Sequence, residues 1–205
     1  MTNEEKAKKQ EDIAKLQEQL STLKLPALLR LQKYNVLKLL KFDFIKDQNS
    51  KEMCKEVDAM ANKIIDDGYI IIRSLNPEEQ AEMYKLIKQN YQFLGRRHFR
   101  EFMIAIEWDF KPDMKFYDIR KAVFDEWIYY LENLEYGDLE GLSISAPPRT
   151  GKTGIGTIFF MWCMLRHPEK SCFFVSHTTA MANKVYNDIL TMLQDNDGSR
   201  NLKAI

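Results

Sequence analysis

The segment Ser145-Ala-Pro-Pro-Arg-Thr-Gly-Lys-Thr153 contains residue types that together bind phosphate. A phosphate chain is held by backbone N–H groups at a helix N-terminus, and glycine is needed where a side chain would collide with the oxygens. The pattern G-x-x-x-x-G-K-[ST] fits residues 146–153, with alanine in place of the first glycine. Gly151 permits the tight turn, Lys152 can reach the β and γ phosphates, and the Thr153 hydroxyl can ligate Mg²⁺. The sequence therefore predicts a site for ATP and Mg²⁺.

Arg149 lies inside this loop, where most phosphate-binding loops need no cation. Its guanidinium either stabilises charge on the transferring γ-phosphoryl group, as an arginine finger does, or pairs with a nearby carboxylate. Lys152 and Arg149 are the candidate catalytic residues. The residues expected to bind nucleotide are Ala146, Pro147, Pro148, Arg149, Thr150, Gly151, Lys152, Thr153 and Gly154. The alternative is an ordinary turn between a strand and a helix.

The elements around the loop favour the phosphate-binding interpretation. Residues 142–145 are β-prone and precede the loop, and residues 151–165 have the length and apolar content of a helix. A turn at 166–170 leads to an apolar strand at 172–176 and a helix at 180–193. This order is typical of the opening of a parallel α/β sheet, so the predicted fold class is α/β.

Upstream residues indicate helices at 4–25, 27–40, 50–67 and 117–134, with a short β-prone run at 69–72. Asn76 followed by Pro77 predicts a capped helix start. The apolar stripe of residues 4–25 either docks on the rest of the chain or forms a short coiled coil. We therefore expect a helical accessory region at 1–95 and the N-terminal part of an ATPase domain at 96–205.

Composition limits the function classes. The chain of 205 residues has 30 basic and 30 acidic residues, so no global field attracts it to nucleic acid or to membranes. Its 3 cysteines form no CxxC pair. The polar N-terminus lacks a signal peptide, and these features predict a soluble, cytoplasmic protein. Basic and aromatic residues interleave at 91–100, where they either contact nucleic-acid backbone or cover a helix beside the core.

The run from Ser143 to Thr153 resembles the variant Walker A motif of tailed-bacteriophage terminase large subunits, whose loop reads P-P-R-x-G-K-[ST]. The double proline and Arg149 are its distinctive part. The similarity continues in the following helix, turn and apolar run, at Phe159, Trp162, Leu165, residues 166–169, residues 173–176, Thr178 and Ala182. It also places the helix at 117–134 near the family's adenine pocket.

This resemblance implies the ATPase motor that packages double-stranded viral DNA into a procapsid, in the host cytoplasm. Its partners would be the DNA, a portal ring and a small terminase subunit. The family's Walker B acidic pair and its nuclease domain follow many tens of residues after the loop and are not found within residues 1–205. We therefore expect the front portion of such a motor, which binds ATP and hydrolyses little alone. The alternatives are another P-loop ATPase, such as a helicase-like enzyme, a small kinase, or a nucleotide-binding interaction protein without turnover.

Overall fold

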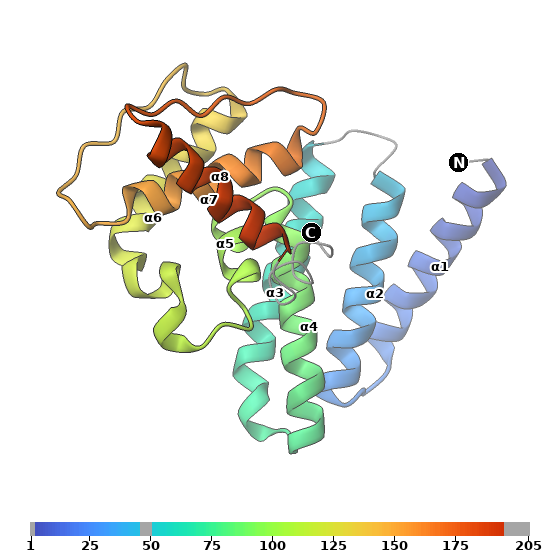
Figure 1. Cartoon of the computed structure of the whole chain (residues 1–205). Coiled ribbons are helices and arrows are strands. Elements are labelled where there is room, and N and C mark those ends of the chain that lie inside the picture. The colour runs from blue at the N-terminus through green and yellow to red at the C-terminus, as the bar shows by residue number, and fades with distance from the viewer. Residues whose placement is uncertain (1–2, 46–50, 195–205) are drawn as a thin grey trace. The chain divides into compact units, whose positions relative to one another are not determined.

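The computed structural model describes residues 3–45 and 51–194, and every regular element in this part of the chain is helical. The expected α/β fold is therefore wrong. Residues 142–145 and 172–176 have no strand partner within 3–45 or 51–194, and Figure 1 draws both segments as loops. The β-prone run at 69–72 is also helical, because residues 69–71 end an α-helix and Ile72 begins a 3-10 turn. Apolar composition suits a strand, but a strand also needs a hydrogen-bonded neighbour, and composition does not supply one.

The described chain separates into two compact units, residues 1–91 and 92–205. The predicted boundary was at residue 95, and the assignment of the two parts as accessory region and ATPase domain stays a prediction. Residues 46–50, where the third predicted helix was expected to begin, and residues 195–205 lie outside the described part. No helix in the described ranges is long and apolar enough to cross a membrane.

The first unit is built from successive helices: α1 (Asn3–Thr22), α2 (Ala27–Ile45), α3 (Lys51–Ile71) and most of α4 (Pro77–Gly95). Helix α1 packs on α2, and α2 packs on α3, as Figure 1 shows for the blue helices. The apolar stripe of α1 therefore docks within the chain. A single 3-10 turn, η1 (Ile72–Ser74), connects α3 with the residues that precede α4.

Helix α4 begins as the sequence predicts. The Asn76 side chain accepts a hydrogen bond from the backbone N–H of Glu79 at 2.9 Å, and Glu79 accepts one from the N–H of Asn76 at 3.2 Å. This reciprocal pair satisfies two N–H groups that a helix start leaves free. Farther along α4, the side chain of Ile87 lies 3.0 Å from the position that a Cβ on Gly68 would take, so α3 and α4 pack closely there.

The second unit contains α5 (Phe99–Ile106), η2 (Pro112–Met114), α6 (Phe116–Tyr136), α7 (Lys152–Arg166) and α8 (Thr179–Gln194). Its core draws on all four α-helices, and its largest buried members are Trp162, Tyr117, Phe99, Phe102 and Phe124. Helix α5 was not predicted. Its eight residues are too few for a clear period in the sequence, although most of them are buried.

Helices α6 and α7 run in the same direction. The start of α6 lies beside the start of α7, because Phe116 contacts the first turn of α7 at Gly154. Their last turns also meet, because Arg166 at the end of α7 hydrogen-bonds the Tyr136 hydroxyl at the end of α6, at 3.0 Å. Both helix N-termini, with their partial positive charge, therefore lie at the end of the unit that carries the predicted phosphate loop.

Candidate phosphate-binding site

The predicted loop forms a backbone concavity directly before α7. Arg149 has a φ of 65° and Gly151 a φ of 98°, so both lie in the left-handed region, and Thr150 between them does not. Arg149 is the one non-glycine residue with positive φ in the described part of the chain. Alternation of left-handed and ordinary residues turns successive N–H groups toward one side, which creates an anion-binding nest. The loop therefore has the backbone form that phosphate binding requires.

The first turn of α7 adds further donors to this concavity. The N–H of Ile155 bonds the Gly151 carbonyl at 3.0 Å and is the first amide used by the helix. The preceding amides of Lys152, Thr153 and Gly154 have no acceptor in the described part of the chain. Free N–H groups at a helix N-terminus attract anions, and the aligned peptide dipoles add to the effect.

The Lys152 side chain folds back over the loop. Its ammonium donates hydrogen bonds to the carbonyl of Ala146 and, at 3.3 Å, to the carbonyl of Pro147. The Thr150 hydroxyl donates to the same Pro147 carbonyl at 2.9 Å, which fixes the bend. The Lys152 ammonium thus lies at the concavity. Its acceptors there are neutral carbonyls, which phosphate oxygens can replace.

The two prolines restrict where the loop can donate hydrogen bonds. Proline has no N–H, so neither Pro147 nor Pro148 can contribute a backbone donor. Both are exposed, while Ala146 is half-buried. Apart from the N–H of Ala146, the backbone donors of the predicted binding segment therefore lie at residues 149–154, after the two prolines.

The start of α6 covers the glycine positions of the loop. A Cβ on Gly151 would lie 2.8 Å from Cζ of Phe124 and 3.1 Å from Cζ of Phe116. A Cβ on Gly154 would collide with the Phe116 ring. Position 151 thus requires glycine both because its φ is positive and because α6 leaves no room for a Cβ. Position 154 requires glycine only because a Cβ would overlap the Phe116 ring. No spacing in the sequence indicates Phe116 as a neighbour of the loop.

Arg120, also on α6, is a second residue that sequence reasoning missed. Its Cδ lies 3.1 Å from the position of a Cβ on Gly151, and its guanidinium lies 4.5 Å from the centre of the Phe116 ring. Three side-chain cations therefore flank the loop: Arg120, Arg149 and Lys152. In the described residues none of them forms an ion pair with a carboxylate. Among the residues that the structure describes, Arg149 therefore lacks the salt bridge that was the alternative to a role at phosphate.

Thr153 is placed where a hydroxyl could meet a metal ion bound to phosphate. It is exposed in the first turn of α7, and its hydroxyl has no hydrogen-bond partner in the described residues. Its carbonyl accepts a hydrogen bond from the Thr157 hydroxyl at 2.8 Å, so the turn itself is tied down. A free hydroxyl beside Lys152 fits the Mg²⁺ ligand that the loop pattern requires.

A cavity of about 390 Å³ lies beside the loop and is mostly apolar. Phe116 and Gly154 belong to both the cavity wall and the loop surroundings. Other wall residues are Ile106, Glu107, Phe110, Met114, Ile158, Met161, Asp188, Thr191 and Met192. A cavity of this size and character accommodates a flat, largely apolar ring system.

Glu107, which is buried in the cavity wall, stabilises the start of α6. Its carboxylate accepts a hydrogen bond from the backbone N–H of Tyr117 at 3.1 Å, and the N–H of Phe116 also bonds it. Burial raises the pKa of Glu107 to about 6, and these two backbone donors partly oppose the rise. The start of α6, which carries Phe116 and Arg120, therefore depends on the protonation of a buried acid.

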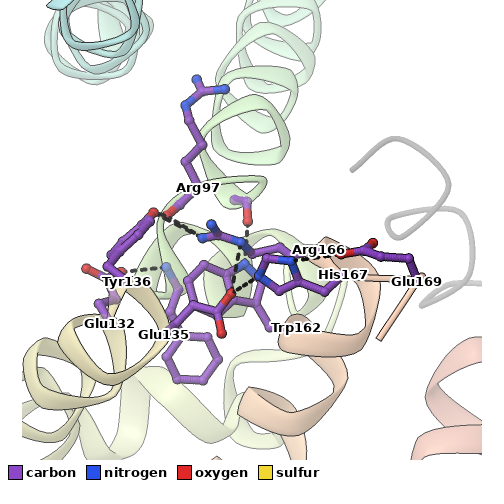
Figure 2. Close-up of polar contacts among 10 residues, drawn as sticks. Arg97, Glu132, Glu135, Tyr136, Trp162, Arg166, His167 and Glu169 are labelled. Carbon is purple, nitrogen blue, oxygen red and sulfur yellow. Dashed lines mark hydrogen bonds and ion pairs between the residues drawn. The ribbon is translucent and has the colours of Figure 1, made fainter. Parts of the chain in front are cut away.

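The opposite ends of α6 and α7 form a polar cluster that we call the C-terminal cluster, consisting of Gly95, Arg97, Glu135, Tyr136, Trp162, Arg166 and His167. Figure 2 shows Arg166 between Tyr136 and Trp162, with its guanidinium 4.8 Å and 4.6 Å from the two ring centres. Glu135 lies 3.4 Å from Arg166 Nε and 2.6 Å from His167 Nε2.

The C-terminal cluster satisfies two carbonyls at and just after the end of α4, those of Gly95 and Arg97. Trp162 Nε1 donates to the Gly95 carbonyl at 2.8 Å, and the Tyr136 hydroxyl donates to the Arg97 carbonyl. Arg166 donates to the same Arg97 carbonyl at 3.3 Å. Because the C-termini of α4, α6 and α7 converge there, their partial negative charges favour the arginine. The cluster is therefore structural.

The same region contains a cysteine, a histidine and a glutamate, but it is not arranged for nucleophilic catalysis. Burial, followed by a hydrogen bond to Glu135, raises the pKa of the Cys163 thiol. A nucleophilic cysteine needs a lowered pKa, because the thiolate is the reactive form. Cys163 therefore stays a thiol near neutral pH.

One group of side chains in the described residues could share a metal ion: His98, Glu101 and Glu132, with ligand atoms within 4.8 Å of one another. Glu132 already accepts the backbone N–H of Phe99 at 2.5 Å. The two carboxylates lie at the start of α5, where acids stabilise a helix N-terminus. Burial raises the pKa of Glu101. Helix capping accounts for this group without an ion.

The basic and aromatic residues at 91–100 are used within the protein. The Arg97 guanidinium lies 4.7 Å from the centre of the Phe93 ring, and Arg100 lies 3.4 Å from an oxygen of Asp125. Phe93 and Phe99 are buried. These contacts favour the second interpretation of the segment, in which it covers a helix beside the core.

Comparison with protein-family models, with curated proteins and with solved structures found no match for this chain. Function is therefore inferred from the geometry of the loop and from the sequence of its residues.

Proposed function

We propose that residues 146–154 bind ATP together with Mg²⁺, and that the chain is the ATP-binding portion of a motor resembling the terminase large subunits of tailed bacteriophages. The observation that carries the proposal is the nest formed by left-handed Arg149 and Gly151 immediately before Lys152. A left-handed arginine is unfavourable on its own, so its presence in this pattern supports a functional constraint on the backbone.

In the proposed complex, the N–H groups of residues 149–154 surround the phosphates. Lys152 exchanges the carbonyls of Ala146 and Pro147 for oxygens of the β and γ phosphates, and Thr153 holds Mg²⁺, which neutralises phosphate charge when bound. Arg149, exposed at the tip of the loop, contacts or senses the γ-phosphate. The apolar cavity beside Phe116 receives the base.

The packaging role is supported by the loop sequence. The run P-P-R-x-G-K-T matches the variant motif of the terminase family at residues 147–153. Double-stranded viral DNA, a portal ring and a small terminase subunit are the proposed partners, and the host cytoplasm is the proposed location.

A nucleotide-binding role without turnover is the second candidate. In the described residues, neither Lys152 nor Thr153 has a carboxylate partner. Hydrolysis by P-loop enzymes uses such an acid to hold the metal ion. We therefore expect this chain to bind ATP and to release phosphate slowly.

Isothermal titration of the chain with ATP and Mg²⁺ tests the site. Lys152→Ala should weaken binding at least tenfold, because a charge-assisted hydrogen bond contributes about 1.5–3 kcal/mol. Lys184→Ala is the matched control, since Lys184 is an exposed lysine on α8, and it should bind as the wild type does. Equal affinity of the wild type and Lys152→Ala would remove the assignment.

Phosphate release under the same conditions separates the two candidates. Slow release that Lys152→Ala abolishes would support an ATPase site, and stimulation by double-stranded DNA would support the packaging motor. Binding with no release above the Lys152→Ala background would favour the non-hydrolysing role.

A further inference from the structure

Helix α6 places a third cation beside the phosphate loop, outside the loop sequence itself. The Cδ of Arg120 lies 3.1 Å from the position of a Cβ on Gly151, and its guanidinium is only two bonds farther along the side chain. Phe116, on which the guanidinium stacks, contacts both Gly151 and Gly154. The charge of Arg120 is therefore held beside the first turn of α7.

The contacts of Arg120 leave most of its hydrogen-bonding capacity unused. Its one hydrogen bond in the described residues is a long one, 3.3 Å from Nη1 to the Phe116 carbonyl. A guanidinium has five N–H donors in a planar fork that matches the oxygens of a phosphate group. Stacking on Phe116 holds the plane of this fork without occupying its edge.

Charge balance in the second unit distinguishes Arg120 from its neighbours. Arg100 lies 3.4 Å from Asp125, and Arg166 lies 3.4 Å from Glu135. Arg120 has no carboxylate partner in the described residues, and its Cδ approaches Gly151, the chain neighbour of Lys152, which has no carboxylate partner there either. Like charges gathered at two helix N-termini repel one another, and a polyanion would relieve that repulsion.

We propose that Arg120 is a phosphate-binding residue of this site, and that it adapts the site to a polyphosphate chain in preference to a single phosphate. The inference rests on the proposed nucleotide function. On binding, the guanidinium keeps its stack on Phe116 and exchanges the Phe116 carbonyl for phosphate oxygens. Lys152 and Arg120 then contact the chain from the loop and from α6.

Calorimetric titration of the full chain with inorganic triphosphate and with orthophosphate, both with Mg²⁺, tests this proposal. Arg120→Met keeps an apolar side chain over Phe116 and removes the charge. It should weaken triphosphate binding about tenfold, because one charge-assisted hydrogen bond is lost. Lys121→Met is the matched control on the exposed side of α6, and it should stay within about twofold of the wild type. The difference in triphosphate affinity between the wild type and Arg120→Met should shrink at high ionic strength, because salt screens a direct charge interaction.

The outcomes separate this inference from the proposed function. Wild-type affinity in Arg120→Met, together with lost binding in Lys152→Ala, would overturn the role of Arg120 and leave the phosphate site intact. Absence of binding of both triphosphate and ATP by the wild type would overturn both. If circular dichroism shows that Arg120→Met does not fold, Arg120→Gln replaces it with the same expected loss. A loss that is equal for triphosphate and orthophosphate, and independent of salt, would indicate a structural residue and contradict the proposal.

Discussion

Arg149 combines an unfavourable backbone with a charge at the tip of the loop. For a residue with a Cβ, the left-handed region costs about 1 kcal/mol relative to glycine. The φ of 65° at Arg149 therefore lowers stability, and the neighbouring φ of 98° at Gly151 does not. If the loop binds phosphate as proposed, this strain is the cost of a backbone form that can collect N–H groups on one side of the loop.

Substitution at Arg149 should separate backbone strain from charge. Arg149→Gly is expected to raise the free energy of unfolding by roughly 0.5–1 kcal/mol, because the left-handed conformation suits glycine. Arg149→Ala keeps the strain and should leave stability close to the wild type. Both variants lose the guanidinium, so both should bind ATP more weakly. Denaturant unfolding and calorimetry measure the two effects, and equal stability of the glycine and alanine variants would contradict the strain.

Glu107 makes stability depend on pH in a defined direction. Its pKa is about 6 in the folded protein and 4.5 in its unperturbed state. An acid with a higher pKa in the folded state binds its proton more tightly there. Its contribution to stability is therefore fully present below the unfolded pKa and is lost as the pH rises from 4.5 to about 6.

Glu107→Gln should remove this dependence, because the amide does not ionise. The free energy of unfolding of the variant, minus that of the wild type, is expected to grow by about 2 kcal/mol between pH 4 and pH 7. Other titrating groups cancel in this difference. Urea unfolding at several pH values measures it, and a difference that stays flat or falls with pH would show that the buried carboxyl has an ordinary pKa.

At the scale of elements, α7 is fixed at both of its ends. Its first turn meets α6 through Phe116 at Gly154, and its last turn joins the C-terminal cluster through Arg166. A helix of 15 residues is about 22 Å long, so the two contacts lie far apart. Parallel α6 and α7 thus hold the loop at residues 146–151 at one end and the carbonyls of Gly95 and Arg97 at the other.

The glycines of α7 provide a matched pair for testing the contact with α6. A Cβ on Gly154 would overlap Phe116, whereas a Cβ on Gly156 would meet nothing within 4 Å. Gly156→Ala should raise the free energy of unfolding by about 1 kcal/mol, since alanine favours the helix. Gly154→Ala should lower it by roughly 1–3 kcal/mol, because Phe116 must move. Thermal unfolding distinguishes them, and stabilisation by both would show that Phe116 does not pack there.

Helices were predictable from the sequence where the apolar period was long or a cap was present. The Asn76 cap, observed as a reciprocal pair with Glu79, and the helix at α7 are examples. Helix α5 escaped prediction because its eight residues span only about two helical turns, too few to establish a period in the sequence. Its existence depends on packing against α6 and α7, which are distant in sequence.

The strand predictions failed for a physical reason that composition does not reveal. Phe173 and Val175 are 87% and 88% exposed, so residues 172–176 pack little of their apolar surface. Leu142 and Ile144 pack against the core, while Ser143 and Ser145 are exposed. Residues 142–145 therefore alternate as a strand does, but they lack the hydrogen bonds to a neighbouring strand. Strand formation requires a partner edge, and no segment of the described chain supplies one to either run.

At the scale of the whole molecule, the sequence offered the loop as a candidate phosphate site, which stays a prediction, and gave no sign of the residues that surround it. Gly151, Lys152 and Thr153 could be singled out because their spacing is a local property of the chain. Phe116 and Arg120 precede the loop by about thirty residues and approach it only through the packing of α6 on α7. A residue brought in by tertiary contact leaves no spacing signal.

Ligand binding should therefore protect a discontinuous set of amides. Nucleotide bound at residues 146–154 stabilises the folded state by about 2.7 kcal/mol at a hundredfold excess over Kd. Hydrogen exchange measured with and without ATP and Mg²⁺ should slow most in the loop, in the first turns of α7 and in the first turns of α6. Helices α1 and α2, which pack on each other, should change least. Lys152→Ala should show no ATP-dependent protection, and strongest protection in α1 or α2 would place the ligand elsewhere.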